Sequence, residues 1–142
     1  MTLLTLPLAL QAIAIVFDEF YFHYKRSPLP NWERFGHPID TLSVILTLSI
    51  LLIFPEEEFS SPLYWSAAAF SCALITKDEW IHHKLCTAGE QWLHAILFIL
   101  HPISFYVLFE ISKNPEWTFI LWVQFLILTI FWIYQLLRGL FS

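Results

Sequence analysis

Five long apolar stretches alternate with short polar links along the chain. They cover residues 2–17, 41–54, 62–76, 92–109 and 117–137. The last two contain no Asp, Glu, Lys or Arg, and as helices they are about long enough to cross a hydrocarbon core of roughly 30 Å. The first three reach only about 21 to 24 Å. We therefore expect their polar neighbours to enter the membrane or its edge.

The links carry signals that start and end helices. We expect helices over residues 2–26, 32–54, 62–86, 88–112 and 115–140. Three of them begin with residue types that are favoured at helix starts. These signals are Ser61–Pro62, Thr87 with Glu90, and Asn114–Pro115. Because all links are short, consecutive helices are predicted to run antiparallel as neighbours.

Composition supports a membrane location. Of the 142 residues, 58% are hydrophobic and only 13% are charged, whereas soluble domains carry about 25% charged residues. The chain is therefore predicted to be an all-α integral membrane protein with the lipid bilayer as its main partner. A net charge of −5 gives no basic footprint for nucleic acid. The two cysteines lie far apart on one predicted helix and predict no disulfide or zinc ribbon.

The distribution of basic residues predicts an orientation. Lys and Arg gather at the first link, the third link and the C-terminal end. They are Lys25, Arg26, Arg34, Lys84 and Arg138. The positive-inside rule then places the N-terminus outside and the C-terminus in the cytoplasm, in a bacterial inner membrane. No basic residue precedes the first apolar stretch, so we expect a retained helix and no cleaved signal peptide.

A short internal repeat relates the two halves of the chain. The residues Asp18, Glu19 and His23 recur sixty positions later as Asp78, Glu79 and His83. Each set is followed across a link by a second acid–histidine pair, so we predict a repeat of residues 16–54 in residues 76–112. The first four helices would form a pseudo-twofold bundle of two hairpins, 1–2 and 3–4, with a fifth helix appended.

Acid–histidine pairs are the main candidate chemistry. Five of the six histidines follow an acid by four residues, where random placement would give about half of one such pair. This spacing puts both side chains on one face of an α-helix. Antiparallel packing would bring four of the pairs to one depth. The predicted metal ligands are Glu19, His23, Glu33, His37, Glu79, His83, Glu90 and His94.

Buried carboxylates at one depth repel each other unless cations neutralise them. Imidazole and carboxylate ligands suit iron, zinc and manganese, and we expect two divalent ions, with iron as the first choice. The site type resembles that of ferritin-like di-iron bundles, where two helices supply Glu-x-x-His. Here the spacing is Glu-x-x-x-His, so the comparison is an analogy of site type. The histidine boxes of membrane hydroxylases and desaturases are missing.

Some of the predicted metal ligands also have simpler explanations that need no metal. Glu90 also fits the third position of a capping box, and helix dipoles favour Glu33, His23 and His83 where they stand. All these groups could therefore be interfacial charges without a metal.

Other residues leave alternatives open around the predicted ligands. His82 is an alternative ligand to His83. Asp18 and Asp78 point about 100° away from the glutamates, which favours solvation or salt bridges. Asp40 and His101 return to the ligand face and could support the ligands or line a deeper pocket.

The function predicted from these residues is a di-iron oxidoreductase that acts on a lipid or other hydrophobic substrate. No catalytic residue beyond the metal ligands is assigned. A zinc-dependent membrane hydrolase would use the same ligands, and a non-enzymatic transporter or sensor of divalent metal is a further alternative. A b-type cytochrome would explain paired histidines, but not the acid before each one.

Overall fold

The computed structural model describes residues 3–23, 31–54, 57–78 and 86–141, without the side chains of residues 31–33, 57–60 and 78. The described residues form five α-helices and no strand, so the all-helical prediction is confirmed. The elements are α1 (Leu6–Phe17), the π-helix η1 (Asp18–His23), α2 (Asn31–Ile53), α3 (Glu57–Ile75), the 3₁₀-helix η2 (Thr76–Asp78), α5 (Ala88–Ser112), the 3₁₀-helix η3 (Pro115–Trp117) and α6 (Thr118–Phe141).

Two predicted helix starts are confirmed and one differs. Thr87 caps α5 through Glu90 N–H, and Asn114 caps η3 through Glu116 N–H. Helix α3 begins earlier than predicted, so Pro62 lies within it. Proline has no backbone donor, so one hydrogen bond of the helix is not made at Pro62. Residues 79–85 of the third predicted helix lie outside the described part.

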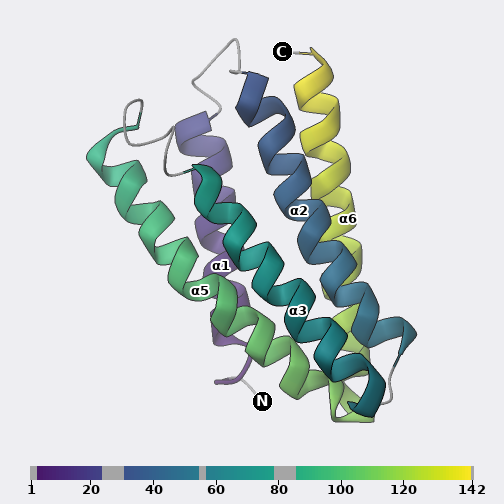
Figure 1. Cartoon of the computed structure of the whole chain (residues 1–142). Helices are drawn as coiled ribbons and strands as arrows, with labels where there is room; N and C mark the ends of the chain where they lie inside the picture. The colour runs from purple at the N-terminus through teal and green to yellow at the C-terminus, as the bar shows by residue number, and fades with distance from the viewer. Residues whose placement is uncertain (1–2, 24–30, 55–56, 79–85, 142) are drawn as a thin grey trace.

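The helices alternate in direction along the bundle (Figure 1). Helix α1 packs chiefly against α5, whereas α2 packs against α3 and α6. An apolar core that includes Leu48, Tyr64 and Ile111, all fully buried, lies where α2 and α5 end. The pseudo-twofold hairpins and the internal repeat stay predictions.

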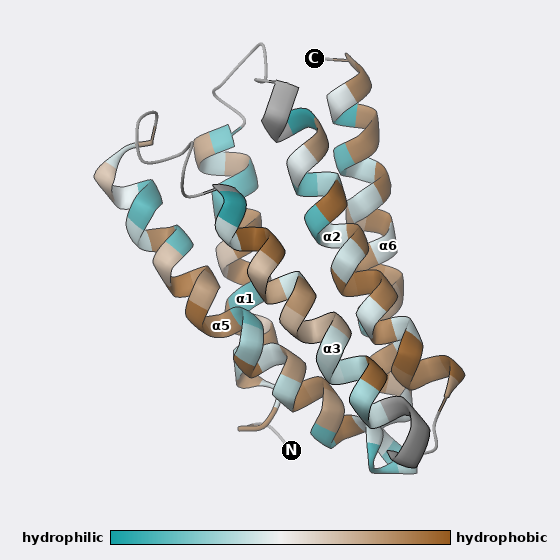
Figure 2. Ribbon diagram, in the orientation of Figure 1, coloured by the Kyte–Doolittle hydropathy of each residue, from teal (hydrophilic) through white to brown (hydrophobic). Residues whose placement is uncertain are grey.

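The outer surface is apolar over most of its length. Four helical segments are long and apolar enough to cross a membrane, and α3 contributes a shorter apolar stretch, Ser61–Ile75. The spans are Leu6–His23, Arg34–Ile53, Ala88–Ser112 and Pro115–Phe141. Figure 2 shows hydrophobic residues along the outside of α6 and hydrophilic residues gathered near the helix ends. This distribution is consistent with a membrane protein.

A chain of hydrogen bonds crosses the middle of the bundle. Gln11 Nε2 donates to His101 Nδ1 at 2.9 Å, and His101 Nε2 lies 3.1 Å from Ser71 Oγ. Ser71 Oγ lies 2.7 Å from Ser43 Oγ, which donates to the carbonyl of Asp40. Since Ser43 uses its proton there, Ser71 donates to Ser43 and His101 Nε2 donates to Ser71. The chain therefore ties α1, α5, α3 and α2 together around a neutral His101.

Helices α2 and α6 approach each other closely at Gly139. Arg34 Nε donates to the Gly139 carbonyl at 2.7 Å, and a Cβ on Gly139 would lie 3.2 Å from the Arg34 carbonyl oxygen. Backbone cannot move aside as a flexible side chain can. Glycine is therefore needed here for close packing of the two helices.

We expect Gly139→Val to lower stability, because the added side chain would push α6 away from α2. Overpacking of this kind costs about 1–3 kcal/mol, which thermal unfolding of the detergent-purified protein would report as a lower midpoint. Gly89→Val is the matched control, since a Cβ there meets only the end of the Phe22 ring, at 3.8 Å. Equal midpoints for both variants would contradict this account of Gly139.

Candidate metal centre

Asp18 and His23 face the same side because the last turns of the first helix are wound as a π-helix. In η1 the hydrogen bonds join residues five apart, so side chains at that spacing align. His23 Nε2 donates to Asp18 Oδ2 at 3.0 Å, and both side chains are buried. Short π-helical segments frequently occur at functional sites.

Glu90 and His94 come from the first turns of α5, which is a regular α-helix there. Their four-residue spacing puts both on one face. Glu90 is fully buried and His94 is 6% exposed. Because α1 packs against α5, this face meets the end of η1, and His94 Nε2 lies 3.4 Å from Asp18 Oδ1.

These two pairs form one compact group. One ligand atom from each of Asp18, His23, Glu90 and His94 lies within 4.8 Å of the other three. Ligands of a tetrahedral ion at 2.0–2.2 Å are roughly 3.4 Å apart, so a small contraction would close the group around a cation. Two ionised carboxylates in a buried site need compensating charge, and one divalent ion would supply it. The group could therefore hold a metal ion.

The structure places Glu19 outside this group. Its carboxylate pairs with the Arg138 guanidinium, which also donates through Nη2 to the His23 carbonyl at 2.7 Å. His23 bonds instead to Asp18, five residues before it in the π-helix. Arg138 on α6 therefore holds η1 at two points.

Three other predicted site residues lie near this group, each farther from it along the bundle than the one before. They are His37, Asp40 and His101. The rings of His37 and His23 pack edge to face with centroids 4.8 Å apart, so His37 adjoins the group without belonging to it. Asp40 Oδ1 accepts from Lys77 Nζ at 2.6 Å. His101 lies deeper along α5 in the hydrogen-bonded chain described above. Each role that the sequence predicts for these three residues stays a prediction.

Several predicted site residues cannot be placed. Glu79, His82 and His83 lie outside the described residues, as does the side chain of Glu33. Three of the eight predicted ligands, Glu33, Glu79 and His83, therefore have no described side-chain position. The prediction from acid–histidine pairs spaced four residues apart missed Asp18. A search for pairs five residues apart, as a π-helix requires, would have included it.

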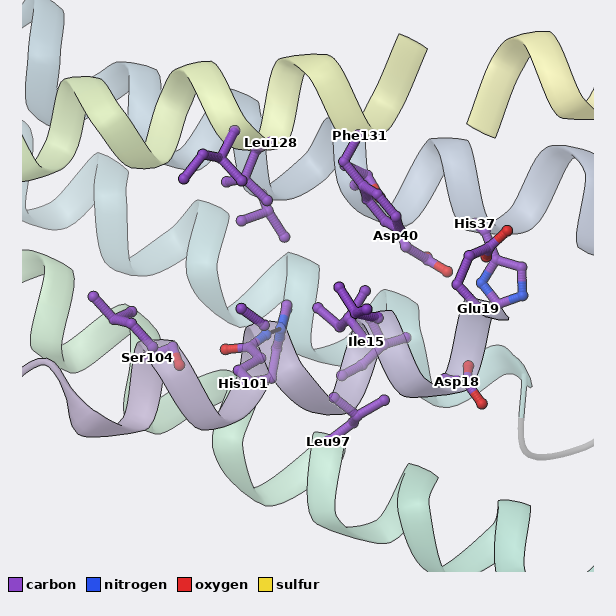
Figure 3. A pocket seen from close by; sticks show the side chains of 18 of the residues that line it. Ile15, Asp18, Glu19, His37, Asp40, Leu97, His101, Ser104, Leu128 and Phe131 are labelled. Carbon is purple, nitrogen blue, oxygen red and sulfur yellow. Dashed lines mark hydrogen bonds between the residues drawn. The ribbon is translucent and has the colours of Figure 1, made fainter. Parts of the chain in front are cut away.

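A cavity of about 220 Å³ adjoins the group. Asp18 and His94 line it together with His37, and apolar side chains such as Ile15 and Leu97 line its middle. Figure 3 shows Asp18, Glu19 and His37 at one end and His101 with Ser104 at the other. A small molecule in the cavity would meet two of the four candidate ligands directly.

Arg138 is expected to position the site through η1 without touching a metal. We expect Arg138→Gln to weaken metal affinity by about 10- to 100-fold, as loss of supporting hydrogen bonds commonly does. Titration of the chelator-treated protein with Co²⁺, followed by absorption, would measure this. Arg34→Gln is the control, because the Arg34 guanidinium bonds to the Gly139 carbonyl on α6. Equal affinities of the two variants would contradict the positioning role.

No protein-family model matches the chain, and no curated protein and no solved structure shows significant similarity to it.

Proposed function

We propose that the protein is a membrane metalloenzyme. It binds one divalent ion at Asp18, His23, Glu90 and His94 and acts on a hydrophobic substrate in the adjoining cavity. The observation that carries the proposal is that two members of the four-residue group, Asp18 and His94, also line an apolar cavity. An ion that only stabilised the fold would need no access to such a space.

The number of ligands favours iron over zinc. A tetrahedral zinc ion would be saturated by four protein ligands and would keep no position for water, as in structural zinc sites. Iron takes six ligands, and two-histidine sites with carboxylate and open positions are typical of non-haem iron oxygenases. Four protein ligands would leave two positions open toward the cavity. This comparison supports the iron oxidoreductase over the zinc hydrolase.

The reaction class that fits is oxidation of a substrate C–H bond. Dioxygen and two electrons from an external donor, with two protons, would give one hydroxyl group on the substrate and one water. Iron would supply the binding and reduction of dioxygen. The protein's own residues would hold the ion, orient the chain of the substrate in the cavity and exclude bulk water.

Transport of the metal is less well supported. The polar residues beyond the site bond to each other, as His101 does to Gln11 and Ser71. Past them lies the apolar core around Leu48 and Ile111. A cation would find no ligands along that part of the described chain.

The proposed location is a bacterial inner membrane with the N-terminus outside and the metal near the cytoplasmic face. The distribution of Lys and Arg along the sequence supports this orientation. A second metal would need ligands from residues 31–33 or 79–85. One ion for each chain is the expectation from the four-residue group alone.

Elemental analysis and an absorption spectrum of the purified protein test the proposal. Protein freed of metal by chelator and reloaded anaerobically with Fe²⁺ should hold about one iron and show no Soret band. Reloading avoids displacement by zinc, which binds such sites more tightly than iron. A Soret band, or no retained metal, would refute the proposal; two irons would restore the binuclear prediction.

A further inference from the structure

The cavity is elongated along the helices and has polar groups at both ends. It extends over residues 8–19, 94–108 and 124–135, which at the rise of an α-helix corresponds to roughly 16–21 Å. Asp18 and His94 lie at one end, and Ser104 and Gln124 line the other. The section between them is lined mostly by apolar side chains such as Ile15 and Leu97 in Figure 3, and the polar Gln11 and His101 there bond to each other. Its shape and polarity suit a chain-like molecule with a polar group.

Ser104 provides a recognition group at the far end. Its side chain is 4% exposed, and its hydroxyl makes no hydrogen bond within the described part of the chain. Leaving a buried hydroxyl unsatisfied is unfavourable, so such groups usually have a partner in the native state. Because Ser104 lines the cavity, a polar atom of a bound molecule would meet this hydroxyl.

The cavity opens sideways between α1 and α6. Val16 on α1 and Ile127 on α6 line it, yet they are 50% and 53% exposed, so they form its rim. Near the metal end the two chain segments meet through the Phe20 and Tyr134 rings, whose centroids are 5.8 Å apart. Along the rest of their length the described parts of α1 and α6 do not pack extensively. In a membrane, this opening faces the lipid chains.

We infer that a single-chain amphiphile enters the cavity from the bilayer between α1 and α6 and binds with its polar group at Ser104. An apolar cavity of about 150 Å³ holds benzene, so about 220 Å³ accommodates some nine non-hydrogen atoms. That excludes a two-chain phospholipid and fits a fatty alcohol or a similar molecule. Its hydrocarbon chain then runs past Leu97 toward Asp18 and His94.

The inference depends on the proposed function in one respect only. If the occupant is the substrate, the carbon atoms remote from its polar group are those that reach the metal, and oxidation would occur there. Entry and binding need no ion. Both can therefore be measured on metal-free protein.

Photolabelling tests the opening. Chelator-treated protein in phosphatidylcholine vesicles is exposed to hexanol that carries a diazirine at mid-chain, and labelled peptides are identified by mass spectrometry. We expect labels on the cavity-lining parts of α1 and α6, displaced by excess octanol. Labels spread evenly over the lipid-facing surfaces and not displaced by octanol would overturn the inference.

Matched tryptophan variants locate the entry. Ile127→Trp and Val16→Trp fill the rim and should reduce the displaceable labelling severalfold. Ile130→Trp and Ile13→Trp are the controls, because these residues are 60% and 65% exposed on the same helices but do not line the cavity. Equal labelling of rim and control variants would rule out this entry.

The polar anchor has its own test. Ser104→Ala should weaken binding of octanol by roughly three- to tenfold, the effect of one hydrogen bond, and should leave binding of octane unchanged. Ser66→Ala is the control, since Ser66 is exposed and bonds within its own helix. An equal loss for octanol and octane would show that Ser104 acts by packing alone and would overturn its role as anchor.

The outcomes separate the two proposals. Rim-dependent labelling in a protein that retains no iron upholds the amphiphile cavity and refutes the metalloenzyme. Retained iron without rim-dependent labelling upholds the metal centre and refutes entry between α1 and α6.

Discussion

Glu90→Gln is expected to abolish stoichiometric metal binding. A tightly held ion draws roughly 10–16 kcal/mol from its ligands, so losing one of four should weaken affinity by more than about 100-fold. Glutamine keeps the size of the side chain, and the fully buried position of Glu90 limits repacking. Metal content after gel filtration, measured by elemental analysis, should fall from about one ion for each chain to nearly none.

Glu110→Gln is the matched control for this prediction. Glu110 lies on the same helix, close to its other end, and its carboxylate pairs with Lys113 at 2.8 Å. It belongs to no candidate metal group among the described residues. Its variant should keep the full metal content. Equal metal content in both variants would refute Glu90 as a ligand.

Asp18→Asn and Glu19→Gln should have opposite consequences, although the two residues are neighbours. Asp18→Asn removes a candidate ligand and is expected to lower metal affinity by more than about 100-fold. Glu19→Gln leaves the four-residue group intact and should change affinity by no more than about tenfold. Isothermal titration of both metal-free variants with Co²⁺ would compare them.

Thermal unfolding adds a second measurement for this pair. Glu19→Gln removes the charge from the partly buried contact with Arg138, and weakening such a hydrogen bond to a charged group costs about 1–3 kcal/mol. A lower unfolding midpoint with retained metal binding is therefore expected for Glu19→Gln. The reverse ranking, with metal lost in Glu19→Gln and retained in Asp18→Asn, would instead support the α-helical register predicted from the four-residue spacing.

The sequence was sufficient to predict the helices because hydropathy and capping residues act locally. Thr87 and Asn114 start helical segments where they were expected to. Glu90 and His94 share a face because α5 is regular where they lie. In each case the conformation depends on residues within one or two turns.

The partner helix and the register at Asp18 could not be predicted from these local rules. Helix α1 packs chiefly against α5 because side chains remote in sequence fit together, and short links alone do not specify such pairs. In the π-helix His23 bonds to Asp18, five residues before it, where the sequence predicted a pair of Glu19 and His23. The periodicity of hydrophobic residues in the sequence does not reveal that η1 is a π-helix, with more residues in each turn than an α-helix. Arg138 contacts Glu19 across more than a hundred residues, which no spacing analysis could detect.

The contact between Arg138 and η1 also has a consequence for biogenesis. Residues 18–23 emerge from the ribosome long before α6 is synthesised. Until then Glu19 lacks the guanidinium that holds it in the finished bundle. The earliest stage at which the π-helical turn gains its full set of contacts is therefore the docking of α6. Metal loading is accordingly expected to follow translation, which pulse-labelled chains captured before and after α6 inserts would reveal.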